Sequence, residues 1–127
     1  MAKSISTLWQ TIVTVMCLCA CTHALEPMVL AGKGKAHAKI VVASQAPEAE
    51  QYAAAELAHF LNQMTGASYE VTFQAPSDQA YLFVGKQAAR FASDEISTRG
   101  LGKDGFVIRS LERGLVLTGD TGRGTLY

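Results

Sequence analysis

Hydrophobic and polar positions along the chain follow patterns that predict several short strands. Residues 39–43 (Lys-Ile-Val-Val-Ala) form a continuous apolar and β-branched run, which fits a strand buried on both faces. Residues 69–73 (Tyr-Glu-Val-Thr-Phe) alternate apolar and polar side chains, so we expect a half-buried strand there. After a turn at residues 76–78, residues 81–84 predict another buried strand, which ends at Gly85.

Residues 47–65 give the clearest helical pattern. Pro47 suits the first helical position, acidic side chains follow in the first turn, and Gly66 is a natural C-terminal cap. Apolar residues recur at helical spacing, which predicts one stripe facing the core. This stripe consists of Ala49, Tyr52, Ala53, Leu57, Phe60, Leu61 and Met64. The opposite, polar face carries Glu48, Gln51, Ala55, His59 and Asn62, so we interpret His59 as a solvated histidine.

The second half of the chain predicts a short helix, a loop and a hairpin. Residues 87–91 suit the helix, and residues 93–104 read as the loop. Residues 105–109 and 115–118 are two short apolar runs joined by a tight turn that contains glycine, which is typical of a β-hairpin.

The order of these elements predicts an α/β fold with α+β character. A strand followed by a crossover helix implies parallel pairing, whereas a hairpin implies antiparallel pairing. We therefore expect a small mixed β-sheet with one main helix, residues 47–65, packed on a face. Residues 119–127 read as a glycine-rich turn and the start of another helix, so we expect the chain to be the front part of a longer protein.

The first residues have the composition of an export signal. Lys3 is the only charge before Glu26, and an apolar run occupies residues 12–20. Such a run fits a signal peptide and is shorter than the roughly 20 residues that a membrane-spanning helix needs. We therefore predict a signal peptide at residues 1–24 and no transmembrane helix. The alternative is a buried N-terminal helix of a cytosolic protein.

Two processing sites fit this segment. Residues 22–24 (Thr-His-Ala) suit ordinary signal peptidase, whereas residues 18–21 (Leu-Cys-Ala-Cys) resemble a lipobox in which Cys21 would become the lipidated first residue. We expect an exported protein that is periplasmic, on the outer surface or secreted, with a lipid anchor at Cys21 as the alternative to ordinary cleavage. Residues 25–38 then form a linker-like lead, and residues 39–127 form one small domain.

Charge and cysteine content narrow the class of partner. The chain has 127 residues, in which 11 Lys and Arg balance 11 Asp and Glu, so we expect no nucleic-acid partner. All three cysteines, Cys17, Cys19 and Cys21, lie in the signal segment. No His or Cys cluster elsewhere in the sequence completes a four-ligand shell, so we assign no metal ligand.

The glycine-rich segment at residues 119–125 resembles a phosphate-binding loop in its context. Gly119 and Gly124 have the spacing of a P-loop, but Thr125 stands where the phosphate-binding lysine is required. We therefore interpret the segment as a tight strand-to-helix turn and assign no cofactor.

Paired carboxylates would mark the chain as a glycosidase in its own right. The candidates are Glu48, Glu50, Glu56, Asp94, Glu95, Asp104 and Asp120. Glu48 and Glu50 point in different directions on a helix, and no pattern marks any pair as facing each other. We therefore assign the acidic residues to surface or capping roles. No serine lies in a nucleophile elbow, and the sequence predicts no catalytic residue.

Several segments nevertheless resemble a known family. They are residues 50–66 (Glu-Gln-Tyr-Ala-Ala-Ala-Glu-Leu-Ala-His-Phe-Leu-Asn-Gln-Met-Thr-Gly), 83–85 (Phe-Val-Gly), 103–108 (Lys-Asp-Gly-Phe-Val-Ile), 115–119 (Leu-Val-Leu-Thr-Gly) and 124–127 (Gly-Thr-Leu-Tyr). Together they resemble the N-terminal α/β domain of bacterial alpha-glucuronidases (glycoside hydrolase family 67) and the related domain that precedes the barrel in beta-N-acetylhexosaminidases. The resemblance implies that a downstream (β/α)₈ barrel carries the catalytic carboxylates, so none is assigned here.

The resemblance implies a non-catalytic N-terminal accessory domain of an exported glycoside hydrolase that degrades polysaccharide such as xylan. Its partner would be the downstream catalytic barrel of the same chain. The alternative is an exported or surface-anchored module that binds carbohydrate or a partner without hydrolysis, which solvent-facing aromatic side chains would favour. Four aromatic residues lie at positions that the pattern assigns to the core, and for two others the pattern is less clear. The four are Tyr52, Phe60, Phe73 and Phe83, and the two are Tyr69 and Tyr81.

Overall fold

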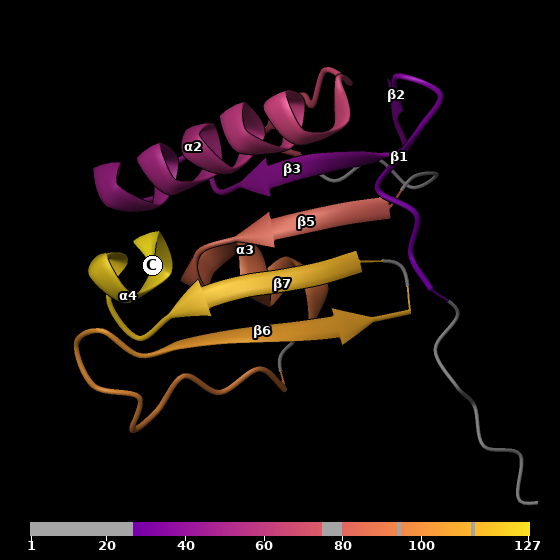
Figure 1. The fold of residues 1–127 in the computed structure, drawn as a ribbon. Helices are drawn as coiled ribbons and strands as arrows, with labels where there is room; N and C mark the ends of the chain where they lie inside the picture. Colours follow the sequence, from indigo (N-terminus) through magenta and orange to yellow (C-terminus); the bar gives the residue numbers. More distant parts are fainter. Residues whose placement is uncertain (1–26, 75–79, 94, 113) are drawn as a thin grey trace, which may run out of the picture.

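The computed structural model describes residues 27–74, 80–93, 95–112 and 114–127. Figure 1 shows a sheet with helices on its two faces. The elements are β1 (Ala31–Gly32), β2 (Lys35–Ala36), β3 (Ala38–Val42), α2 (Glu48–Thr65), β4 (Val71–Thr72), β5 (Ala80–Val84), α3 (Lys86–Ala92), β6 (Phe106–Leu111), β7 (Gly114–Gly119) and α4 (Gly122–Leu126).

The main sheet has five strands in the order β4-β3-β5-β7-β6. β3 pairs in parallel with both β4 and β5, and β5 pairs in parallel with β7. Among the described strands of this sheet, only the β6–β7 pair is antiparallel. The predicted mixed sheet and the predicted hairpin are therefore both confirmed.

The apolar run in β3 is buried on both faces of the sheet, as its sequence predicted. Ile40 and Val42 belong to the core beneath α2, and Val41 belongs to a second core beneath α3. None of the three is more than 1% exposed. The sequence predicted one main helix on a face; the structure adds α3 on the opposite face, which closes the second core (Figure 1).

The ends of α2 agree with the predicted signals to within one residue. Pro47 is the N-cap, just outside the helix, with φ −52° and ψ 150°. Gly66 ends the helix in the left-handed conformation at φ +68°, and its N–H donates to the Asn62 carbonyl at 2.9 Å. Glycine adopts this conformation without the steric cost that a Cβ brings.

The predicted core stripe of α2 is wrong at its largest residues. Tyr52, Phe60 and Met64 are 55%, 54% and 79% exposed. The fully buried residues of α2 are small, namely Ala53, Ala54 and Ala58, together with the carboxylate of Glu50. Leu57 and Leu61 of the predicted stripe are partly buried against the same core, so that part of the prediction is confirmed. Alanines let the helix backbone approach the strands closely, and this rotates the large side chains outward.

The predicted half-buried strand at residues 69–73 is also shorter and less buried than expected. Only Val71 and Thr72 pair with β3, and Phe73 is 56% exposed. Tyr69 is buried, although it lies before the strand. Among the other aromatic residues, Phe83 is buried as predicted, and Tyr81 is buried as well.

Part of the lead segment forms a small hairpin that the sequence analysis did not anticipate. β1 and β2 pair antiparallel across a turn in which Lys33 and Gly34 both have positive φ, at +53° and +73°. Two successive positive φ values suit a tight hairpin turn. Met28 and Leu30 pack against the core on the α2 side, so this segment is attached to the domain.

Some predictions fall on residues that the structure does not describe. These are the signal segment at residues 1–24, with Cys21, and the turn at residues 76–78. Within the described ranges, none of the helices combines the length and the apolar character required to cross a membrane.

Candidate functional site at the carboxyl ends of the strands

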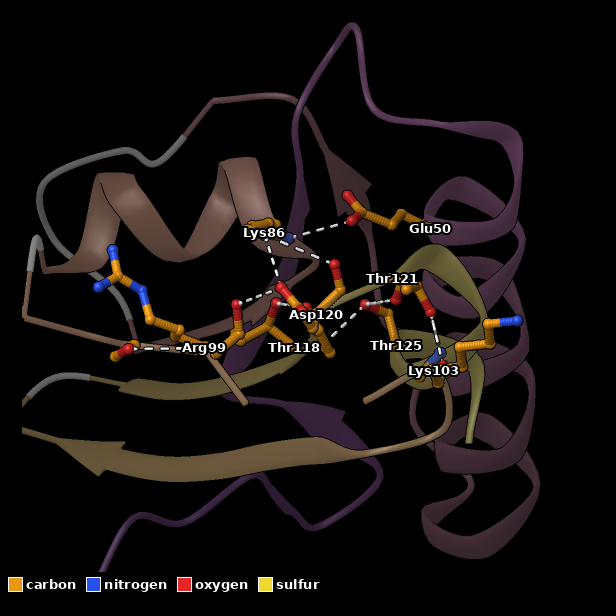
Figure 2. Close-up of polar contacts among 12 residues, drawn as sticks. Glu50, Lys86, Arg99, Lys103, Thr118, Asp120, Thr121 and Thr125 are labelled. Carbon is orange, nitrogen blue, oxygen red and sulfur yellow. Dashed lines mark hydrogen bonds and ion pairs between the residues drawn. The ribbon is translucent and has the colours of Figure 1, made fainter. Parts of the chain in front are cut away.

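The carboxyl ends of β3, β5 and β7 meet at one edge of the sheet. From β3 the chain continues through α2 to β4 on one side, whereas β5 lies on the other side and leads into α3 on the opposite face. In open α/β sheets, ligands bind in the crevice outside such a reversal of strand order. Figure 2 shows the polar side chains at this edge.

The carboxylate of Glu50 occupies this crevice. Glu50 is 4% exposed, and its Oε1 accepts a hydrogen bond from the backbone N–H of Lys86 at 3.1 Å. It thereby caps α3, whose N-cap residue Gly85 has no side chain to do so. Gly85 has φ +94°, and a Cβ there would collide with this carboxylate. The predicted surface role of Glu50 is wrong. Its predicted capping role holds, but the helix that it caps is α3 and not its own helix.

The side chain of Lys86 joins α3 to the end of β7. Its Nζ donates to Asp120 Oδ1 at 2.9 Å, and the hydroxyl of Thr98 donates to the same oxygen at 3.2 Å. The pKa of Asp120 lies below its ordinary value of 3.8, first because of the Lys86 hydrogen bond, then because of the Lys86 charge and the Thr98 hydrogen bond; desolvation opposes them. Asp120 therefore stays ionised and holds residue 98 and α3 against the sheet (Figure 2).

The glycine-rich segment is a strand-to-helix turn, as predicted. Thr121 is the N-cap of α4, and its hydroxyl accepts from the Gly124 N–H at 3.2 Å. The Thr125 hydroxyl accepts from the Gly119 N–H at 2.9 Å. Threonine hydroxyls therefore take two of the N–H groups that a phosphate would need, which agrees with the interpretation of this segment as a turn.

Glu56 is half-buried on α2, and the remaining acidic candidates do not converge on one place with it. Asp104 pairs with Arg123 at 2.6 Å, and Glu48 and Glu95 are exposed. Asp94 lies outside the described residues. His59 is exposed and contacts Gln63 at 3.0 Å, so its interpretation as a surface histidine is confirmed. In the part of the chain that the structure describes, no three His, Cys, Asp or Glu residues are grouped so as to hold a metal.

Concave surfaces lie beside this edge on both faces of the sheet. The α3 cleft lies between α3 and residues 96–99 and has a volume of about 370 Å³. The α2–α4 groove has a volume of about 420 Å³ and is mainly apolar. Its lining includes Tyr52, Phe60, Leu126 and Tyr127.

Sequence reasoning missed Lys86, Thr98 and the burial of Glu50. One signal was present: Lys86 directly follows Gly85, which ends a predicted buried strand, and residues after such strands gather at one edge of a parallel sheet. Thr98 gave no signal, because it lies in a predicted loop and reaches Asp120 only through the fold.

The mixed sheet, with crossover helices on opposite faces and its own carboxylate in the crevice, defines a small two-faced α/β module. Residues 23–127 match the family described as Glycosyl hydrolase family 67 N-terminus. The chain therefore belongs to this family, and it represents part of an alpha-glucuronidase-like glycoside hydrolase. No curated protein and no solved structure matches it significantly.

Proposed function

We propose that the chain is the non-catalytic N-terminal accessory domain of an exported alpha-glucuronidase-like enzyme that degrades polysaccharide such as xylan. In this proposal the α2–α4 groove packs against the downstream catalytic barrel. The observation that carries the proposal is the apolar character of this groove in a domain of the family 67 N-terminus.

Large apolar side chains surround the groove and are exposed to solvent. Tyr52 and Phe60 project from α2, and Leu126 and Tyr127 are 42% and 70% exposed at the end of α4. Leu117 of β7 lines the groove between them. Contiguous exposed apolar surface with a polar surround is typical of a site that another protein surface covers.

Three acidic side chains form hydrogen bonds or ion pairs within the fold, and this supports a non-catalytic role. A retaining or inverting glycosidase needs two carboxyl groups that face a shared substrate. Here Glu50 caps α3, Asp120 binds Lys86 and Thr98, and Asp104 pairs with Arg123. These three carboxylates stabilise the fold, so the proposed enzyme would carry its catalytic pair elsewhere.

The first test is activity of the 127-residue chain on aryl glucuronides and aryl N-acetylglucosaminides. We expect no turnover. Hydrolysis by the purified chain that is lost when a Glu of α2 is replaced by Gln would refute the siting of the chemistry outside this domain.

The second test addresses the groove. A catalytic barrel encoded downstream in the same gene would be produced separately and its affinity for this chain measured. We expect Phe60→Ser to weaken association about tenfold or more, as for a central apolar contact. Phe91→Ser is the matched control, because Phe91 is 65% exposed on α3, outside the groove. Equal loss in both variants, or a gene that stops after Tyr127, would overturn the docking proposal.

A second candidate function is favoured by the same exposed rings. Tyr52 and Tyr127 both line the groove, and aromatic faces stack on sugars. The chain would then be an exported or surface-anchored module that binds carbohydrate without hydrolysis. Binding of xylo-oligosaccharides to the chain, lost in Tyr52→Ala, would favour this candidate over barrel docking.

Export and lipidation are proposals that rest on the sequence of residues 1–24 alone. Cys21→Ser separates the two forms of processing. If Cys21 is the lipidated residue, this variant loses incorporation of labelled fatty acid and leaves the membrane fraction. If ordinary cleavage after Ala24 applies, the mature protein is unchanged in both respects.

A further inference from the structure

The α3 cleft concentrates positive charge on the face of the sheet opposite the α2–α4 groove. Its lining includes Lys86 and Arg90 of α3 and Arg99 of the following loop, against the single carboxylate of Asp120. Lys86 is paired with Asp120 at 2.9 Å. Among the described residues, neither the Arg90 nor the Arg99 side chain has a hydrogen bond or an ion pair. The cleft therefore holds an excess of cationic donors.

Stability of the domain accounts for Lys86, which pairs with Asp120, but it does not explain why two arginines also line the cleft. Lys86 and Arg90 are four residues apart on α3, where like charges repel. Arg90 lies in the last turn of α3 and complements the helix dipole there, but Arg99 has no such role. Figure 2 shows the Arg99 side chain extending from its loop toward α3, and both arginines line the same cleft.

Besides Ala89 and Ile96, the rest of the lining carries hydroxyl groups around a fixed floor. Ser93, Ser97 and Thr98 line the cleft, and Thr118 of β7 lies below them, 1% exposed. The floor is held in place because Asp120 binds both Lys86 and Thr98. Guanidinium groups match the two oxygens of a carboxylate, and hydroxyl groups match those of a sugar. A volume of about 370 Å³ lies within the usual range of small-molecule sites.

We propose that the α3 cleft binds a hydroxylated carboxylate of monosaccharide size, such as a uronic acid. Arg90 and Arg99 hold the carboxylate, and the serine and threonine hydroxyls contact the ring hydroxyls. The site is separate from the groove proposed for docking, so either proposal can fail while the other stands.

The experiment titrates the full chain with D-glucuronate and follows backbone amide signals by NMR. We expect shifts at residues 86–99 that saturate, and no saturable shifts with D-glucose, which lacks the carboxylate. Arg99→Gln and Arg90→Gln should each weaken binding about tenfold, the loss typical of one charge-assisted hydrogen bond. Arg99→Lys, which keeps the charge without the planar fork, should fall between Arg99→Gln and the parent chain.

Arg109→Gln is the matched control, because Arg109 is an exposed arginine on β6 that does not line the cleft. Its binding should equal that of the parent chain, and thermal melts should show that all variants are folded. Absence of saturable binding, or equal binding by the parent chain and both cleft variants, overturns the proposal. Inorganic sulfate binding as tightly as glucuronate overturns the sugar-acid assignment in favour of a simple anion site.

Discussion

At the scale of single residues, the contact between Glu50 and Gly85 links two helices that lie on opposite faces of the sheet. Gly85 has φ +94°, and the Glu50 carboxylate fills the space where a side chain would begin. Gly85→Ala should therefore combine backbone strain with displacement of the buried Glu50 side chain. We expect it to lower the free energy of unfolding by about 2–4 kcal/mol, measured by urea denaturation.

Gly102→Ala separates the two contributions. Gly102 has φ +74°, but nothing lies within 4 Å of a Cβ built there. This variant should lose only the cost of the left-handed conformation, about 1–2 kcal/mol. Equal losses at the two positions would show that the Glu50 carboxylate does not constrain Gly85.

The lowered pKa of Asp120 makes a prediction about acid stability. A carboxyl group whose pKa is depressed by folding stabilises the protein above its unfolded pKa and loses that contribution as the pH falls through its folded pKa. The stabilisation by Asp120 should thus be complete well above 3.8 and disappear below it. Unfolding free energies of the parent chain and Asp120→Asn, measured from about pH 6 to about pH 2.5, should converge at the acidic end. A gap that stays constant would contradict this assignment.

At the scale of elements, α2 packs on the sheet through alanines. Ala54 is 0% exposed, so a larger side chain there has no room. Ala54→Leu should cost about 1–3 kcal/mol of unfolding free energy, the usual effect of overpacking. Met64→Ala is the control: Met64 is 79% exposed and should change stability by less than about 0.5 kcal/mol. A larger loss of stability in Met64→Ala than in Ala54→Leu would instead support the predicted stripe as the buried side of α2.

The elements that the sequence predicted well are those with a strong local signal. The continuous apolar run at residues 39–43 and the helix ended by Gly66 were found to within one residue. The orientation of α2 was not, because helical spacing alone allowed Tyr52, Phe60 and Met64 to form the buried side. Which side of α2 faces the sheet depends on how closely the helix packs against the strands. That distance is set by the packed structure and not by the local sequence.

At the scale of the whole molecule, family membership was predictable and the candidate site was not. The resemblance rested on segments spread over residues 50–127, and the family match confirms it. The Lys86, Thr98 and Asp120 cluster joins three segments that only the strand order brings together. A single sequence carries no local signal for such a contact.

The exposed groove makes a prediction for the chain on its own. With Tyr52, Phe60, Leu126 and Tyr127 facing water, the chain should self-associate at high concentration. The double variant Tyr52→Ser, Phe60→Ser should shift sedimentation toward the monomer, because it removes the two rings that α2 contributes. Phe91→Ser should leave the distribution between monomer and associated forms unchanged. An equal shift in this variant would show that association does not depend on the groove.

The position of β3 between β4 and β5 also determines when its strand pairs can form during synthesis of the chain. β3 is the first strand of the main sheet to be synthesised, yet both of its neighbours come after the whole of α2. Parallel pairing across such a gap is slow, because the connection must close before any contact forms. A growing chain therefore carries Ile40, Val41 and Val42 with no partner strand until residue 72 is made, and without β5 until residue 84 is made. The half-made chain, rather than the finished domain, is the form that chaperones and proteases encounter with this apolar strand uncovered.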